Sequence, residues 1–168
     1  MKTELKKWLA ENLDTTPKNI ENIINEEKAT TYLWIWSIFE KRIFDGYMTT
    51  SKILNSSEIL SKYYNEFNLD CIAKKIYKRY QDNKRLKNLL HKDKNIRFES
   101  FLNKTFEDLS ESEKIYLLLY TAYRYRNNIF HGNKGVLSWV NYSEEINDCL
   151  SIMMSIIDVN KKQKSLIM

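Results

Sequence analysis

Glycine, proline, cysteine and histidine are all scarce in this sequence. Its 168 residues include three glycines, one proline, two cysteines and two histidines. So few turn-forming residues leave little material for β-hairpins or flexible linkers, and the abundance of Lys, Leu, Glu and Ile favours helices. A chain of this length is one ordinary domain with a single core. We therefore expect an all-α compact helical bundle, one domain over residues 1–168, whose tail frays from about residue 160.

Long apolar runs and clustered metal ligands are also missing. No apolar stretch is long enough to cross a bilayer, and the start, MKTELKK, lacks the apolar segment of a signal peptide. We expect a cytoplasmic protein that does not contact a membrane. Cys71 and Cys149 stand apart, without a CxxC pattern or a nearby histidine. They are most simply buried thiols, so we expect no metal site and no cofactor.

Positive charge is concentrated in one segment. The chain carries a net charge of +5, and residues 70–94 alone hold nine basic and three acidic residues. A concentrated basic stripe is typical of proteins that bind polyanions, although it also suits a solvated helix face. We expect one basic helix over residues 70–91, with Lys74, Lys78 and Arg85 pointing away from its apolar side.

Start and stop signals divide the rest of the chain into helices. Ser110 with Glu113 and Asn141 with Glu144 are capping boxes, which open a helix to about residue 131 and a last helix to about residue 159. Pro17 suits a first helical turn. The other expected elements are a helix over 2–13, one over 17–27 that continues or re-enters into 29–44, a connection over 49–57, a short helix over 58–67, and a loop with a short helix over 92–109.

The helix that begins at Ser110 ends in the segment RNNIFHG, residues 126–132. An arginine provides a permanent charge and a planar fork of donors that suits phosphate. A histidine is the side chain that accepts and returns a proton near neutral pH. Together, Arg126 and His131 indicate phosphodiester chemistry.

This segment resembles the signature of HEPN domains, all-helical modules found in RNA-cleaving toxins and antiviral defence proteins. The matching residues are Arg126, the polar Asn127 and His131, with Gly132 following, and residues 34–40 are similar to an early helix of several such domains. The resemblance implies a HEPN-like fold and an RNA-cleaving enzyme that acts as a homodimer with a composite site. A toxin or antiphage role, with an antitoxin or other neutralising protein as partner, also follows from the resemblance alone.

Helical periodicity places Arg126 on an apolar face. At about 100° per residue, Arg126 follows Ile115, Leu119 and Ala122, and a guanidinium there needs a partner because an uncompensated buried charge is costly. Glu40 is likewise a carboxylate on an apolar stripe. We expect a Glu40–Arg126 pair that holds the guanidinium in a fixed orientation. The alternative is an internal ion pair with no substrate.

His131 lies about 140° around the helix from Arg126, so the two side chains diverge on an unbroken helix. They converge if the helix ends at Gly132, or if a two-fold dimer brings two copies of the segment together. The alternative for His131 is a favourable position on the helix dipole.

We therefore expect a metal-independent endoribonuclease that works by acid–base transesterification. One His131 would take the 2′-hydroxyl proton, Arg126 would stabilise the phosphorus oxygens, and Asn127 would orient the site. The His131 of the second subunit would protonate the leaving oxygen. The RNA-binding residues expected are Lys74, Lys78, Arg85 and Lys134. Trp139 either stacks a base or packs on the core, and the aromatic residues expected in the core are Trp34, Trp36, Tyr116, Tyr120 and Tyr123.

Two other kinds of protein remain possible on this sequence. One is a HEPN-like module that binds RNA, a nucleotide or a protein without cutting. The other is an inert interaction protein whose aromatic and Met-rich faces pack against a larger partner. A cleavage assay separates both from the enzyme.

Overall fold

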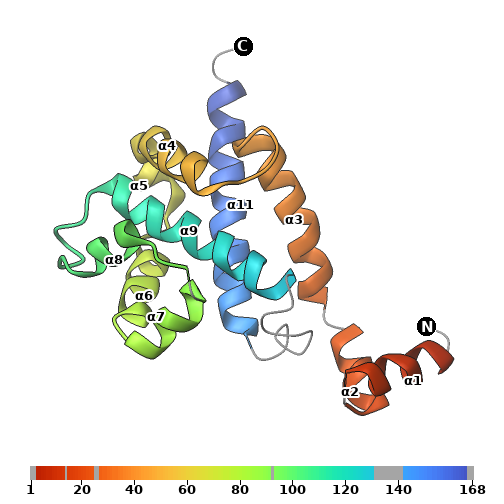
Figure 1. Ribbon diagram of the computed structural model, residues 1–168. Coiled ribbons are helices and arrows are strands. Elements are labelled where there is room, and N and C mark those ends of the chain that lie inside the picture. The colour runs from red at the N-terminus through yellow and green to blue at the C-terminus, as the bar shows by residue number, and fades with distance from the viewer. Residues whose placement is uncertain (1–2, 14, 25–26, 92, 131–141, 166–168) are drawn as a thin grey trace.

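The computed structural model of this chain describes residues 3–13, 15–24, 27–91, 93–130 and 142–165, and these ranges contain helices and no strand (Figure 1). The all-α prediction is confirmed. The elements in chain order are α1 (Thr3–Asn12), α2 (Pro17–Ile24), α3 (Glu27–Ile43), α4 (Thr50–Leu60), the 3-10 turn η1 (Ser61–Tyr63), α5 (Tyr64–Phe67), α6 (Asp70–Tyr80), α7 (Asn83–Leu90), α8 (Ile96–Leu102), α9 (Glu111–Phe130) and α11 (Ser143–Ser165).

Helix α9 lies at the centre of the bundle. The predicted capping box forms at its start, where the Ser110 backbone N–H donates to Glu113 Oε2 at 2.9 Å and the Glu113 N–H donates to Ser110 Oγ at 3.3 Å. In Figure 1, α9 crosses α11, and α3 lies beside α11. Helices α3 and α11 begin at the same end of the bundle, since Lys28 Nζ on α3 donates to Ser143 Oγ on α11.

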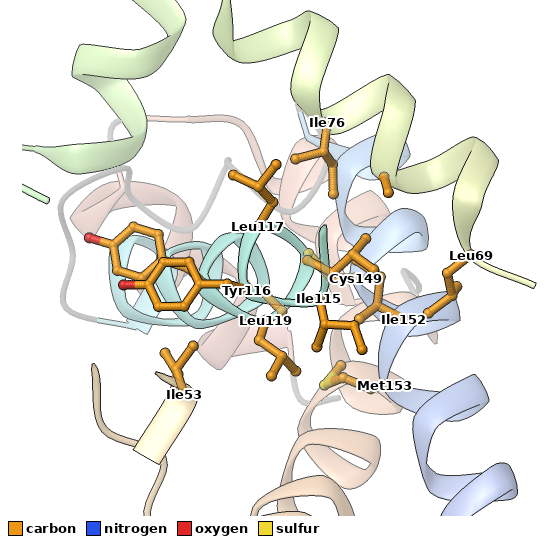
Figure 2. Close-up of a cluster of buried hydrophobic side chains, with 14 of the residues drawn as sticks. Ile53, Leu69, Ile76, Ile115, Tyr116, Leu117, Leu119, Cys149, Ile152 and Met153 are labelled. Carbon is orange, nitrogen blue, oxygen red and sulfur yellow. The ribbon is translucent and has the colours of Figure 1, made fainter. Parts of the chain in front are cut away.

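The hydrophobic core forms where α4, α6 and α11 meet α9. Figure 2 shows Leu117 of α9 beside Ile76 of α6, and Ile115 and Leu119 near Met153 of α11. All five side chains are at most 1% exposed. Burial of a large aliphatic side chain stabilises a fold by about 1.5–3 kcal/mol. Helix α9 buries four of them among residues 115–119, namely Ile115, Leu117, Leu118 and Leu119, and therefore contributes strongly to this core.

The expected connection over 49–57 is wrong, because these residues form most of α4. Thr49 caps the helix by accepting from the Lys52 N–H at 3.4 Å. Ser57 is buried, and its hydroxyl donates to the Ile53 carbonyl at 2.7 Å. Serine and threonine favour loops when their hydroxyls compete with the backbone, but here they cap the helix or bond back along it.

The basic segment is also divided differently from the prediction. Helix α6 ends at Tyr80, and α7 begins at Asn83 after Asp82, whose carboxylate accepts from the Arg85 N–H at 2.8 Å. An aspartate at the N-cap position starts a new helix because it satisfies a donor that has no partner within the helix. At the other end of the chain, α11 continues to Ser165, beyond the expected end near residue 159.

Two predictions of burial are wrong. Trp34 is 68% exposed, because the buried stripe of α3 consists of Tyr32, Trp36 and Phe39. Cys71 is exposed as well, whereas Cys149 is buried in α11. Burial raises the pKa of the Cys149 thiol well above its usual range, because the thiolate would have to form away from water.

We predict that the two thiols differ sharply in reactivity under native conditions. Cys71 should react promptly with a thiol reagent at pH 8, and Cys149 should react only after denaturant is added, because only the thiolate attacks. Counting modified thiols by mass spectrometry measures this. The Cys71→Ser chain is the control and should take up no reagent before unfolding; prompt labelling of that chain would contradict the packing of α11.

Candidate functional site

Arg126 is half-buried in the last turns of α9, on the side that faces α3. Its guanidinium carbon lies 5.8 Å from the centre of the Trp36 ring, and Nη1 donates to Asn127 Oδ1 at 3.1 Å. The predicted stripe is confirmed, since Ile115, Leu119 and Ala122 are fully buried on the same side. The stripe and an aromatic face therefore fix where the charge sits.

The expected partner of Arg126 has another contact. Glu40 Oε1 accepts from the Met48 backbone N–H at 3.0 Å. A Glu40–Arg126 pair is not among the ion pairs between described residues, and we correct that prediction. The cause lies just after α3, where Asp45 and Gly46 take positive φ values of 47° and 119° and turn the chain back over Glu40.

The second half of the motif is not part of the described structure. His131, Lys134 and Trp139 lie outside the described residues, and so does the capping residue Asn141. Helix α9 is described to Phe130, which directly precedes His131 in the chain. The site that the structure describes therefore consists of Arg126, Asn127 and their neighbours on α3 and α9.

Arg124 and Asn128, one turn apart on α9, are buried polar residues that the sequence analysis missed. Arg124 is 6% exposed and donates from Nε to the Leu89 carbonyl at 3.1 Å and from Nη2 to the Leu90 carbonyl at 2.6 Å. Its Nη1 also pairs with Asp93. Asn128 is 2% exposed and donates to the Leu89 carbonyl at 3.0 Å.

These bonds cap the C-terminal end of α7. The last carbonyls of a helix have no partner within it, and a buried cation among them satisfies both the lone pairs and the helix dipole. A helical projection of α9 could have revealed this pair, because it places Arg124 and Asn128 on one side of the helix with Leu117 and Thr121. The sequence alone does not say which helix end this stripe meets.

The basic segment is partly neutralised within the fold. Lys74 pairs with Glu107 at 3.1 Å, and Lys75 pairs with Glu144 at 2.6 Å and with Asp148 at 2.8 Å. Hydrogen bonds to Asp148 and Glu144 raise the pKa of Lys75. Lys74 is therefore a weaker candidate for RNA contact than the sequence suggested, whereas the exposed side chains of Lys78 and Arg85 remain candidates.

A pocket of about 560 Å³ opens between α4, α8 and α9. Its wall on α9 is aromatic, with Tyr116 and Tyr120 stacked at 5.8 Å between ring centres. We call it the tyrosine pocket, and the residues lining it that matter below are Thr50, Ser51, Lys94, Arg97, Tyr116, Tyr120, Tyr123 and Arg124. Such a volume suits a small ligand.

A second, smaller pocket of about 240 Å³ lies between α6, α7, α9 and α11. Arg79, Arg85 and Glu145 line it, together with Tyr125 and Asn128. Arg79 is already paired with Glu145 at 3.4 Å across the pocket. Arg79 therefore already has an ion-pair partner in the protein. The exposed Arg85 is the cation that a ligand in this smaller pocket would meet.

The described residues hold no group of three or more His, Cys, Asp or Glu side chains placed to bind a metal ion. Within the same ranges, no helix is both long and apolar enough to cross a membrane. Comparison with known proteins gives no match of this chain to a family model, to a curated protein or to a solved structure.

We predict that the same substitution has effects of different size at two arginines of α9. Arg124→Gln should lower the free energy of unfolding by about 2–4 kcal/mol, because it leaves buried helix-end carbonyls without their charged donor. Arg126→Gln should cost less than about 1 kcal/mol, since the Arg126 side chain is only partly buried and water can replace much of what its guanidinium loses. Urea titrations measure both; equal losses would contradict the structural role of Arg124.

Proposed function

We propose that this protein is a metal-independent endoribonuclease whose phosphate-binding group is Arg126. The observation that carries the proposal is the way the guanidinium is held: the Trp36 ring lies against it, Asn127 bonds its Nη1, and the next histidine in the chain is His131. A guanidinium is permanently charged, and its planar fork of donors suits the oxygens of a phosphate.

The chemistry proposed is transesterification at a ribose 2′-hydroxyl. His131 would act as the base, Arg126 would stabilise the charge that develops on the phosphorus oxygens, and Asn127 would orient the guanidinium. The 2′-oxygen attacks phosphorus as the bond from phosphorus to the 5′-oxygen breaks, and the leaving oxygen takes a proton from the His131 of a second subunit or from water. The products are a 2′,3′-cyclic phosphate and a 5′-hydroxyl. Since DNA lacks the attacking hydroxyl, the proposal predicts RNA as the only nucleic acid that is cut.

Burial on α9 supports Arg126 over Arg124 as the reactive arginine. Arg124 is enclosed, and its donors bind the end of α7 and Asp93. Arg126 is more exposed and lies one residue from Asn127, whose side chain is also partly exposed. A phosphate can approach Arg126 without breaking the cap of α7.

We predict that Arg126→Ala and His131→Ala each reduce cleavage of a single-stranded RNA by about 100-fold or more, because each removes a group that acts in the transition state. Arg126→Lys should also be poor, since lysine lacks the planar fork. Arg42→Ala, which removes an exposed arginine of α3, is the control and should retain activity. The assay runs in EDTA, and product ends are read by mass spectrometry; full activity of His131→Ala, or cleavage that depends on magnesium, would overturn the mechanism.

We further propose that the active form is a homodimer formed through α3. This helix exposes three large apolar side chains on its outer side, Leu33 (46%), Trp34 (68%) and Ile38 (45%), and the same helix supports Arg126 through Trp36. An apolar surface of this kind is typical of protein contacts. A two-fold contact there would set the two copies of α3 side by side, with one Arg126 site behind each.

We predict that Trp34→Glu yields a monomer in light scattering and loses most cleavage activity. Placing a charge in a desolvated contact is costly, and the homodimer is the proposed active form. Ile59→Glu, at an apolar residue of α4 that is 61% exposed, is the matched control and should stay dimeric and active. A wild-type chain that is both monomeric and active would refute the dimer and leave the ribonuclease assignment intact.

A second candidate function is favoured by the tyrosine pocket: an RNA- or nucleotide-binding module that does not cut. Binding there needs neither Arg126 nor His131. Wild-type protein that binds RNA and never cleaves it would decide for this function. The role of toxin or antiphage effector, with a neutralising protein as partner, extends the ribonuclease proposal by resemblance to HEPN domains.

A further inference from the structure

One side of α9 carries a row of tyrosines that leads to the proposed site, and Tyr123 is its partly exposed member, since Tyr116 and Tyr120 are 5% and 2% exposed. Tyr116, Tyr120, Tyr123 and Asn127 follow one another at the spacing that keeps side chains on one face of a helix. The rings of Tyr120 and Tyr123 are 6.3 Å apart, which extends the stacked pair formed by Tyr116 and Tyr120. The row spans about 16 Å along the helix, from the tyrosine pocket to the residue that bonds Arg126.

The polar rim of the tyrosine pocket is cationic. Lys94 and Arg97 line it, and neither is in an ion pair with another described residue, in contrast to Lys74 and Lys75. Asp93 also lines the pocket, but it is paired with Arg124. Thr50 and Ser51, on the first turn of α4, add backbone donors and the positive end of a helix dipole to the same rim.

The wall and rim therefore offer two kinds of contact side by side. Tyr123 offers a partly exposed aromatic ring, and its neighbour Tyr120 lies 6.3 Å away between ring centres. Burial raises the pKa of Tyr120. Asn95 donates to the Tyr116 hydroxyl at 3.0 Å and fixes the orientation of that ring. A flat ring against the tyrosines and an anion at Lys94 and Arg97 is the chemistry of a phosphorylated nucleoside.

We propose that the tyrosine pocket binds one nucleotide unit, with its base at the tyrosines and its phosphate at Lys94, Arg97 and the first turn of α4. The unit is part of an RNA strand or a free nucleotide, and the experiment distinguishes these two sources. If the unit belongs to an RNA strand, the pocket is a substrate subsite, and this assignment rests on the proposed function. Binding of a free nucleotide does not rest on that function.

The test measures binding without cleavage. Calorimetric titrations use 5′-AMP and 5′-UMP, with adenosine and inorganic phosphate as single-feature probes, and fluorescence polarisation uses a labelled 2′-O-methyl hexaribonucleotide that lacks the attacking hydroxyl. Lys94→Ala/Arg97→Ala removes the cationic rim. Lys84→Ala/Lys87→Ala, which removes two exposed charges of α7 outside the pocket, is the matched control for net charge. Tyr123→Leu removes a partly exposed ring.

We expect the rim variant to weaken binding by about tenfold or more and the α7 variant by less than about threefold, because a phosphate held at the rim makes charge-assisted bonds there. Tyr123→Leu should weaken the binding of nucleotides and of the oligonucleotide but not the binding of phosphate. If the wild type binds the oligonucleotide but no mononucleotide, the pocket is an RNA subsite. If it binds mononucleotides, and the variants weaken that binding but leave the affinity for the oligonucleotide unchanged, the ligand is a free nucleotide.

Equal weakening by the rim and α7 variants, or no saturable binding of any nucleotide probe by the wild type, would overturn the proposal. Arg126→Ala separates it from the proposed function, because that chain should lose cleavage and keep binding at the tyrosine pocket. Wild-type protein that binds nucleotides at the rim without cutting RNA leaves the pocket in place and refutes the nuclease.

Discussion

The bond between the Arg124 guanidinium and the end of α7 is the interaction on which the arrangement of this bundle depends. One buried side chain of the central helix donates to the carbonyls of Leu89 and Leu90 and pairs with Asp93 just beyond them. It therefore fixes where α7 ends and where the chain leaves towards α8. The tyrosine pocket has Arg124 in its wall, and the smaller pocket has Asn128, so both cavities take their shape from this cap.

Different sides of helix α9 carry the residues that pack the fold and the residues that are candidates for function. Ile115, Leu119 and Ala122 form the core, and Arg124 with Asn128 holds α7. A third sector carries Tyr116, Tyr120, Tyr123 and Asn127, whereas Arg126 continues the apolar stripe of Ile115. Packing occupies most of the helix surface. In the C-terminal half of α9, the described side chains that are only partly buried are Tyr123, Arg126 and Asn127, so a ligand would meet the helix there.

Charge is divided in the same way. Two cations of α6 face acidic residues of α11: Lys75 pairs with Glu144 and Asp148, and Arg79 pairs with Glu145. Arg85, Lys94 and Arg97 have exposed side chains instead. The exposed positive charge therefore lies away from α11, at Arg85 and at the rim of the tyrosine pocket. Counting basic residues along the chain could not show this, because their acidic partners are distant in sequence.

Local signals in the sequence determined the helical class, the start of α9 at its capping box and the apolar stripe that carries Arg126. Each depends on residues within a few turns of one another, which is the range over which helical periodicity acts. Tertiary structure decided the partners. Glu40 bonds a backbone N–H after the turn at Gly46 instead of Arg126, and Arg124 finds its acceptors 35 residues away at Leu89. Hydrogen bonds of buried groups are satisfied by whichever atoms packing brings near, and packing is settled by the whole chain.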